Sequence, residues 1–145
     1  MKSEHSILIV DDEFSVLKGL KKTLLRKGYS VDTANNGLEA SEKLRHKHFD
    51  VVVSELVMPE LDGLGLLNKA KEIDRNIIFL LITAYGSIDN AVEAIKLGAF
   101  DYITKPFSPL MLLSVIEKAL NEKQELHDSN LLSDSDSVVN ELKKD

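Results

Sequence analysis

Short runs of apolar, largely β-branched residues alternate with segments of helical periodicity along most of the chain, and this alternation constrains the fold more than any other feature. The pattern predicts a parallel sheet with helices on both faces, because parallel strands need crossover helices between them. Five strand-then-helix units fit, so we expect an α/β fold. The expected strands are 6–10, 29–33, 50–54, 77–82 and 100–103, and the expected helices are 14–27, 37–46, 64–73, 87–97 and 108 onward.

The apolar stripe of each expected helix indicates the side that packs on the sheet. Gly28 is expected to end the first helix, whose stripe is Leu17, Leu20 and Leu24. Leu38 and Leu44 are expected to point inward from the second helix. The expected stripes of the third and fifth helices are Leu64, Leu67, Ala70 and Ile73, and Leu112, Leu113, Ile116, Ala119 and Leu120.

Composition excludes several classes of protein. The 145 residues include no cysteine, which rules out disulfides, thiol catalysis and cysteine-based metal sites. The longest apolar run is 77–82, far short of the ~20 residues that cross a membrane, and 7–10 is too short for a secretory signal, so we expect a cytoplasmic protein. A net charge of −6 without a basic cluster argues against direct nucleic-acid binding.

The composition changes near residue 121. We expect residues 1–122 to form one domain and 123–145 to form an acidic, polar linker or tail that can continue the last helix. Leu112, Ala119 and Leu126 are seven residues apart, but Lys123 interrupts the pattern, so a coiled coil is only weakly indicated. The chain holds no Walker loop and no helix-turn-helix, so we expect a stand-alone regulator or an isolated piece of a longer one.

Chemistry-bearing residues stand at four predicted strand ends, where ligands bind in open parallel sheets. Carboxylates gathered there repel one another unless a hard cation shares them, and oxygen-only ligands favour magnesium over zinc. A lysine and a threonine suit the oxygens of a phosphoryl group. Taken singly, each has a structural explanation, such as helix capping or a solvated charge, but their coincidence favours one site. The residues are Asp11, Asp12 and Glu13, then Glu55, Thr83 and Lys105.

Residues 6–121 resemble the receiver domain of two-component response regulators, the CheY-like family. The resemblance is carried by Ile-Leu-Ile-Val-Asp-Asp-Glu at 7–13, Met-Pro at 58–59, Asp-Gly at 62–63, Thr-Ala at 83–84 and Lys-Pro-Phe at 105–107. It implies a doubly wound, flavodoxin-like (βα)5 fold with strand order 2-1-3-4-5. It also implies a magnesium ion held by the acidic pair, and transfer of phosphate from a sensor histidine kinase to an aspartate that ends the third strand.

The same resemblance assigns further roles. Lys105 would pair with the phosphoryl group, Thr83 would contact it, and the Lys105–Pro106 bond would be cis. Thr83 would pass the change to Tyr102 on the fifth strand. An output domain or a second copy would then bind the face made by the fourth helix, fifth strand and fifth helix, including Ile88, Val92, Lys96 and Phe107. Residues 83–102 look most like those of sigma-54 enhancer-binding (NtrC-type) transcriptional activators.

One position departs from the family pattern. The residue that should accept phosphate is Glu55, and no aspartate stands within four residues of it. The extra methylene moves the carboxylate by about 1.5 Å, and a misplacement of ~1 Å can cost ~10²-fold in a positioned reaction, so normal phosphotransfer is not expected. Glu55, with a charge of −1 where a phosphoryl group carries roughly −2, would act as a partial phosphomimic. The alternative is a resting receiver in which Glu55 simply pairs with Lys105.

Three other classes were weighed. An interaction-only pseudo-receiver would have lost its magnesium site. A haloacid-dehalogenase-like phosphatase would need acidic ligands after the lysine, where Pro106-Phe107-Ser108 stands. A flavin or dinucleotide binder would need a glycine- or hydroxyl-rich loop after the first strand, where Asp11 and Asp12 would repel phosphate. We therefore expect a signalling domain rather than an enzyme.

Overall fold

The computed structural model describes the backbone of residues 4–143 and the side chains of residues 4–126. Strands and helices alternate throughout, as the apolar pattern predicts, and each boundary lies within a few residues of its expected place. The elements are β1 (Ser6–Val10), α1 (Phe14–Arg26), β2 (Ser30–Ala34), α2 (Gly37–His46), β3 (Val51–Glu55), α3 (Gly63–Ile73), β4 (Ile78–Thr83), α4 (Ile88–Lys96), β5 (Asp101–Thr104) and α5 (Pro109–Lys143).

The five strands form one parallel sheet in the order β2-β1-β3-β4-β5, which confirms the expected doubly wound fold. The strand order reverses between β1 and β3, the place where such sheets bind ligands. The register brings the strand ends level, since Val10 pairs with Ser54, and Glu55 pairs with Ile82. Residues that follow the strands therefore meet at one edge of the sheet.

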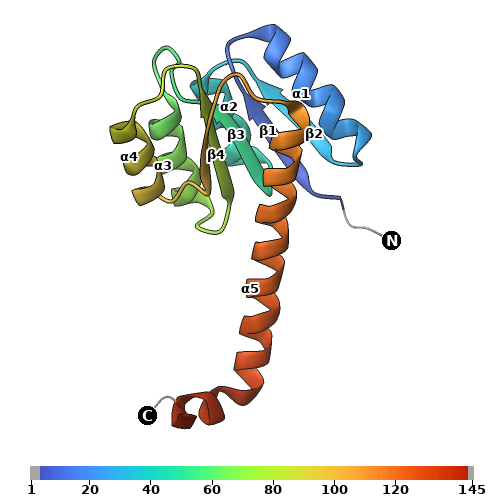
Figure 1. Ribbon diagram of the computed structural model, residues 1–145, viewed down its shortest axis with the longest axis vertical. Helices are drawn as coiled ribbons and strands as arrows, with labels where there is room; N and C mark the ends of the chain where they lie inside the picture. The colour runs from blue at the N-terminus through green and yellow to red at the C-terminus, as the bar shows by residue number, and fades with distance from the viewer. Residues whose placement is uncertain (1–3, 144–145) are drawn as a thin grey trace.

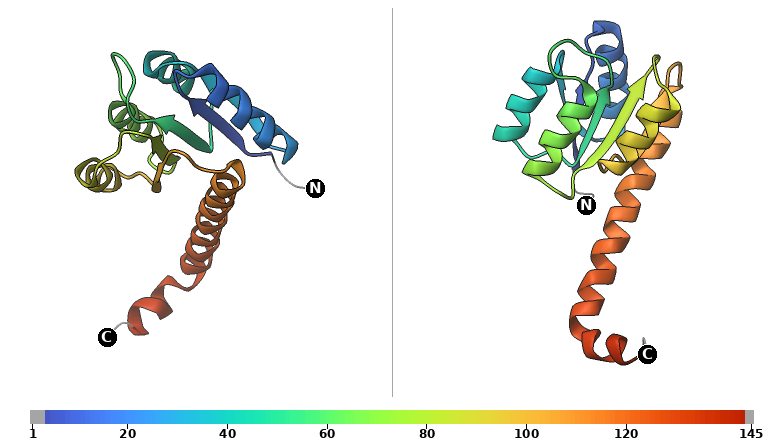
Figure 2. Two further views of the ribbon diagram at one scale, coloured as in Figure 1. Left: turned by 45° about the horizontal axis from the view of Figure 1, so that its top comes forward. Right: turned by 90° about the vertical axis from the view of Figure 1, so that its left-hand side faces the viewer.

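Helices α1 and α5 cover one face of the sheet, and α2, α3 and α4 cover the other (Figures 1 and 2). Every residue of β3 and β4 is buried, as their continuous apolar runs predict for central strands. Alternate residues of β1 feed the two cores, with Leu8 and Val10 on one side and Ile7 and Ile9 on the other. The polar ends of these rigid strands are thus fixed from both faces.

Two expected core positions are exposed. Leu38 is 51% exposed and Ile73 is 48% exposed, so both predictions were wrong. At the start of α2, Gly37 lies against the backbone of Leu61 where no Cβ would fit, which leaves its neighbour Leu38 facing solvent. At the start of α3, a Cβ on Gly63 would lie 2.6 Å from the carbonyl oxygen of Glu55, and this close approach sets the helix rotation. Helix α3 then buries Leu66, Leu67 and Ala70.

Helix α5 lies on the sheet through its expected stripe and then continues away from the domain to Lys143 (Figure 1). Leu112 and Ala119 are buried in the domain core, so two of the three heptad positions serve the domain itself. Leu126 is 67% exposed. Gly28 ends α1 with a φ of 93°, as predicted. Within the described part of the chain, no helix is both long enough and apolar enough to cross a membrane.

Candidate functional site

Asp11 is the first residue after β1 and is completely buried. Its Oδ1 accepts a hydrogen bond from the Glu13 N–H at 2.9 Å, and its Oδ2 accepts one from Lys105 Nζ at 3.0 Å. Burial raises the pKa of Asp11 and the charge of Glu55 adds to this, while the two hydrogen bonds act in the opposite direction without cancelling it. A buried carboxylate in this condition favours a cation beside it.

Glu55 is the last residue of β3 and is 4% exposed. Its Oε1 lies 2.8 Å from Lys105 Nζ, and its Oε2 accepts hydrogen bonds from Leu56 N–H at 2.8 Å and Val57 N–H at 3.1 Å. Burial alone would raise the pKa of Glu55, but hydrogen bonds from Lys105, Thr83 and the Val57 N–H outweigh it and the net direction is downward. The charged form of Glu55 is therefore built into the fold.

Lys105 lies at the centre of the cluster. Its ammonium group is bonded to Asp11, to Glu55 and, at 3.2 Å, to Glu13 Oε1. Burial would lower the pKa of Lys105, but Glu55 and Asp11 together raise it well above its ordinary value. Glu13 was expected only to complement the dipole of α1, and its reach to Lys105 was missed. The run Asp11-Asp12-Glu13 itself was the signal for a third carboxylate.

Thr83 and Tyr102 lie on neighbouring strands. Thr83 ends β4 with no exposed surface, and its Oγ1 accepts a hydrogen bond from Tyr85 N–H at 3.0 Å. Tyr102 packs against the α2–α3–α4 core, and its hydroxyl is buried without a hydrogen-bond partner among the described side chains. A Cβ on Gly86 would lie 2.9 Å from a ring carbon of Tyr102. Gly86 thus makes room for Tyr102, a role that no sequence pattern indicated.

Asp12 is exposed and lies between Asp11 and Glu13, which both contact Lys105. The donor chemistry around it fits magnesium, because the cluster offers carboxylate oxygens only. Within residues 4–126 no three acidic or histidine side chains are gathered as a ready metal site, and the Lys105 ammonium lies among the carboxylates instead. Magnesium binding by Asp11, Asp12 and Glu55 therefore stays a prediction.

The loop after β3 completes this edge of the sheet. Glu60 has a φ of 69°, and Gly63 N–H donates to the Leu56 carbonyl at 2.7 Å, so the loop folds back over the end of β3. The Lys105–Pro106 bond is cis, as the family resemblance implied. In the same region, Lys105 N–H donates to the Thr83 carbonyl at 2.9 Å. Together these contacts fix Glu55, Thr83 and Lys105 within one small region.

The expected readout face carries exposed apolar side chains. Ile88 is 82% exposed and Val92 is 46% exposed on α4, and Lys96 is also exposed. Phe107 differs, since it packs partly against the α1–α5 core and offers less surface than expected. The apolar residues of α4 that face solvent are the kind that a partner covers.

Comparison with known families finds one match across most of the chain. The family model described as the response regulator receiver domain matches residues 7–117. The transcriptional regulatory protein ZraR of Klebsiella oxytoca is 45% identical over 114 residues, which are 79% of this chain and 26% of that protein. The regulatory protein AtoC of Escherichia coli K12 is 38% identical over 120 residues, or 83% of this chain and 26% of AtoC. The chain thus spans about a quarter of the length of these relatives.

Solved structures show the same similarity. A response regulator receiver domain protein (CheY-like) from Methanospirillum hungatei JF-1 superposes with a TM-score of 0.82 at 32% identity, covering 85% of this chain and 98% of that one. The beryllofluoride-activated NtrC4 receiver domain, solved as a dimer, superposes with a TM-score of 0.77 at 38% identity, covering 81% of this chain and 98% of that one. Fold and sequence therefore point to one family.

Proposed function

Because the chain belongs to the response regulator receiver domain family, we propose that Glu55 occupies its phosphoacceptor position and that the chain is not phosphorylated there. The chain is a receiver domain of two-component response regulators, related to the ZraR and AtoC transcriptional regulators. It belongs to a family of signalling domains rather than classical enzymes. We propose further that it works in the cytoplasm and regulates transcription through an output domain.

The observation that carries this proposal is the pairing of Glu55 with Lys105. Glu55 Oε1 lies 2.8 Å from the ammonium that would otherwise pair with the phosphoryl group, and Oε2 accepts two backbone N–H bonds. Both oxygens are thus engaged by groups that would serve a phosphoryl anion. The extra methylene also displaces the nucleophile from the place of an aspartate, which opposes in-line attack on a phosphoryl donor.

We propose that this charge shifts the receiver part of the way toward its activated arrangement. Glu55 supplies −1, against roughly −1.5 to −2 and three acceptor oxygens for a phosphoryl group. The shift should therefore be incomplete, about 1–2 kcal/mol in an equilibrium whose two states differ by a few. The hydrogen bond that Thr83 contributes to Glu55 supports this view, because Thr83 is the residue expected to relay the change to Tyr102.

Magnesium enters through the same carboxylates. We propose that Asp11, Asp12 and Glu55 hold it, with the buried Asp11 as the anchor. When bound, magnesium would neutralise the charge that gathers on transferring phosphoryl oxygens. Titration with magnesium separates this proposal from an interaction-only pseudo-receiver: shifts of the amide resonances of residues 10–13 at millimolar metal support it, and their absence favours the pseudo-receiver.

Phosphorylation is tested by incubation with acetyl phosphate and magnesium, followed by intact mass measurement. The wild-type chain should keep its mass, and Glu55→Asp should gain one phosphoryl group, because aspartate restores the expected nucleophile. Glu55→Gln is the matched control that can do neither. Robust labelling of the wild-type chain would refute the proposal. Hydrolysis of a generic aryl phosphate would instead revive the phosphatase alternative.

The activation state is tested by NMR. Amide shifts of α4 and β5 in the wild-type chain are compared with those of Glu55→Asp, free and bound to fluoroberyllate. Wild-type shifts that lie between the two end states support a partial phosphomimic. Shifts that coincide with free Glu55→Asp identify a resting receiver, in which the Glu55–Lys105 contact is only a local ion pair.

The partners follow from family membership and the exposed surface. We propose a sensor histidine kinase as the upstream partner, although Glu55 would prevent ordinary transfer. The output domain, or a second copy of the chain, would cover the α4–β5–α5 face through Ile88, Val92 and Ile95, which are 82%, 46% and 51% exposed. The NtrC4 receiver domain, which was solved as a dimer, supports the second arrangement.

A further inference from the structure

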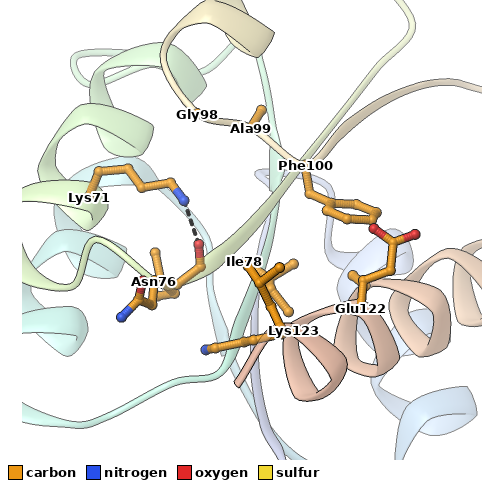
Figure 3. A pocket seen from close by; sticks show the side chains of 11 residues that line it. Lys71, Asn76, Ile78, Gly98, Ala99, Phe100, Glu122 and Lys123 are labelled. Atoms are coloured by element: carbon orange, nitrogen blue, oxygen red, sulfur yellow. Dashed lines mark hydrogen bonds between the residues drawn. The ribbon is translucent and has the colours of Figure 1, made fainter. Parts of the chain in front are cut away.

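A second concave region lies at the opposite end of the sheet from Lys105, where β4 and β5 begin (Figure 3). The cavity has a volume of about 520 Å³ and is bounded by the ends of α3 and α4 and by the middle of α5. Pockets of 300–1,000 Å³ are typical of small-molecule sites. Nothing in the receiver chemistry described above uses this cavity.

The floor of the cavity is apolar. Ile77 and Ile78 at the start of β4 are 2% and 6% exposed, Ala99 is 7% exposed and Ala119 of α5 is 1% exposed. Phe100 adds a half-buried aromatic ring beside them. The backbone N–H groups of the two strand starts are already bonded to other carbonyls, so this floor presents carbon rather than polar atoms. It suits the apolar body of a ligand.

Two ammonium groups stand over this floor from different helices. Lys71 of α3 donates to the Ile77 carbonyl at 2.7 Å and to the Arg75 carbonyl at 3.4 Å. Its stem lies against Gly98, where a Cβ would be 3.1 Å from Lys71 Cε, so the side chain is held in place. Lys123 of α5 is half-buried and extends into the same cavity (Figure 3).

The charge of this pair is not matched by an acid. The ion pairs among residues 4–126 all lie elsewhere and include neither Lys71 nor Lys123. Figure 3 shows the Glu122 carboxylate beside Phe100, on the side away from Lys71. Burial lowers the pKa of Lys71, and the like charge of Lys123 adds to this against the opposing charge of Asp74. An anion between the two lysines would relieve this repulsion.

We propose that this cavity binds a small organic carboxylate whose apolar body lies on Ile78, Ala99 and Phe100 and whose charged end is held by Lys71 and Lys123. The lysines supply charge complementarity, and the floor supplies the area for burial. Because α5 forms one wall through Ala119, Glu122, Lys123 and Leu126, a bound molecule would join this helix to the starts of β4 and β5. The site is independent of Glu55 and of phosphorylation.

The test uses 4-phenylbutyrate as the probe and amide NMR of the whole chain as the readout. Saturable shifts should appear at residues 77, 78, 98–100 and 119–126, with an apparent dissociation constant of about 1–5 mM. Amide exchange in residues 119–126 should slow in its presence. Absence of saturable shifts in this range, or saturation at another surface, would overturn the proposal.

Two controls separate charge from hydrophobic contact. The uncharged 4-phenylbutanol and the cationic 4-phenylbutylamine have the same apolar body, and each should bind at least tenfold more weakly than the acid. Lys71→Met and Lys123→Met keep side-chain length and remove one ammonium each, so each should weaken the acid about tenfold without changing the alcohol. Equal binding of all three compounds, or unchanged affinity in both variants, would contradict the role of the lysines.

Discussion

The two ends of the sheet each hold a sheltered lysine, and the two lysines have opposite surroundings. Lys105 at the carboxyl end meets three carboxylates, whereas Lys71 at the amino end meets two backbone carbonyls and the like charge of Lys123. Burial lowers the pKa of both, yet the net direction is upward for Lys105 and downward for Lys71. Burial therefore acts alike at the two ends, and the partners decide the sign.

The difference separates an internally neutralised cluster from an open one. At the carboxyl end the ammonium is already paired with Glu55, so the charge that a phosphoryl group would supply is partly present in the chain itself. At the amino end the positive charge has no acid among the described residues, so the complement has to come from outside. One end thus encodes a state of the protein, and the other offers a binding site.

Removal of the Lys105 charge should break this comparison most strongly. Lys105→Met leaves Asp11 and Glu55, 0% and 4% exposed, without their shared cation. Loss of one partner of a buried ion pair typically costs about 3–5 kcal/mol, and we expect the free energy of unfolding to fall by that amount. Urea unfolding near neutral pH measures it.

Lys71→Met is the matched control for this experiment. It removes an ammonium that bonds only to carbonyls and faces another cation, so its cost should stay below about 1 kcal/mol. Similar losses in the two variants would mean that the carboxylates around Lys105 contribute no more than the carbonyls around Lys71. The pKa of the two lysines would then be a poor guide to their energetic roles.

The pH dependence of Glu55→Gln sharpens the comparison from the acid side. The pKa of Glu55 lies below its ordinary value of 4.5 in the folded chain, so its charge adds stability above that value and loses it as the pH falls through the folded pKa. The variant should be about 2 kcal/mol less stable than wild type at about pH 7, and the gap should close toward about pH 3. Urea unfolding at four or five pH values measures the gap, and a gap that does not change with pH would contradict a charged, bonded Glu55.

Much of the fold was predictable because the strands carry their burial in their composition. The runs 51–53 and 78–82 are continuous and apolar, which happens only where both faces of a strand are covered, and both strands are central. Helix rotation was less predictable. Leu38 and Ile73 fit a helical stripe, but the rotation of their helices depends on glycine contacts with distant backbone, which periodicity alone does not encode.

The candidate site was predictable to the extent that strand ends converge. Asp11, Glu55 and Lys105 meet as that rule requires, with Thr83 bonded to Glu55. The reach of Glu13 to Lys105 could not be assigned, because a flexible side chain at a helix start chooses among several partners only when the fold is complete. The packing of Tyr102 against Gly86 depends equally on tertiary contact. The metal assignment still awaits magnesium titration.

Tyr102→Phe probes the one buried polar side-chain atom without a partner in residues 4–126. An unbonded hydroxyl costs desolvation on burial, so its removal should raise the free energy of unfolding by about 1 kcal/mol. Tyr85→Phe, at a side chain that is 73% exposed, is the control and should change nothing. A loss of stability in Tyr102→Phe would show that the hydroxyl makes a hydrogen bond in solution.

The smallest expected effect concerns Lys71 at alkaline pH, and it distinguishes the two lysines directly. A lysine whose pKa is lowered on folding is penalised while charged, so the folded chain gains stability as the pH rises through the folded pKa toward the ordinary value of 10.5. A lysine whose pKa is raised shows the opposite slope, and only above 10.5. Between about pH 8 and pH 10, stability should therefore rise relative to Lys71→Met, and Lys123→Met should flatten this rise because it removes the like charge. Parallel curves for wild type and Lys71→Met would show that solvent reaches the Lys71 ammonium freely and that the two ends of the sheet treat a lysine alike.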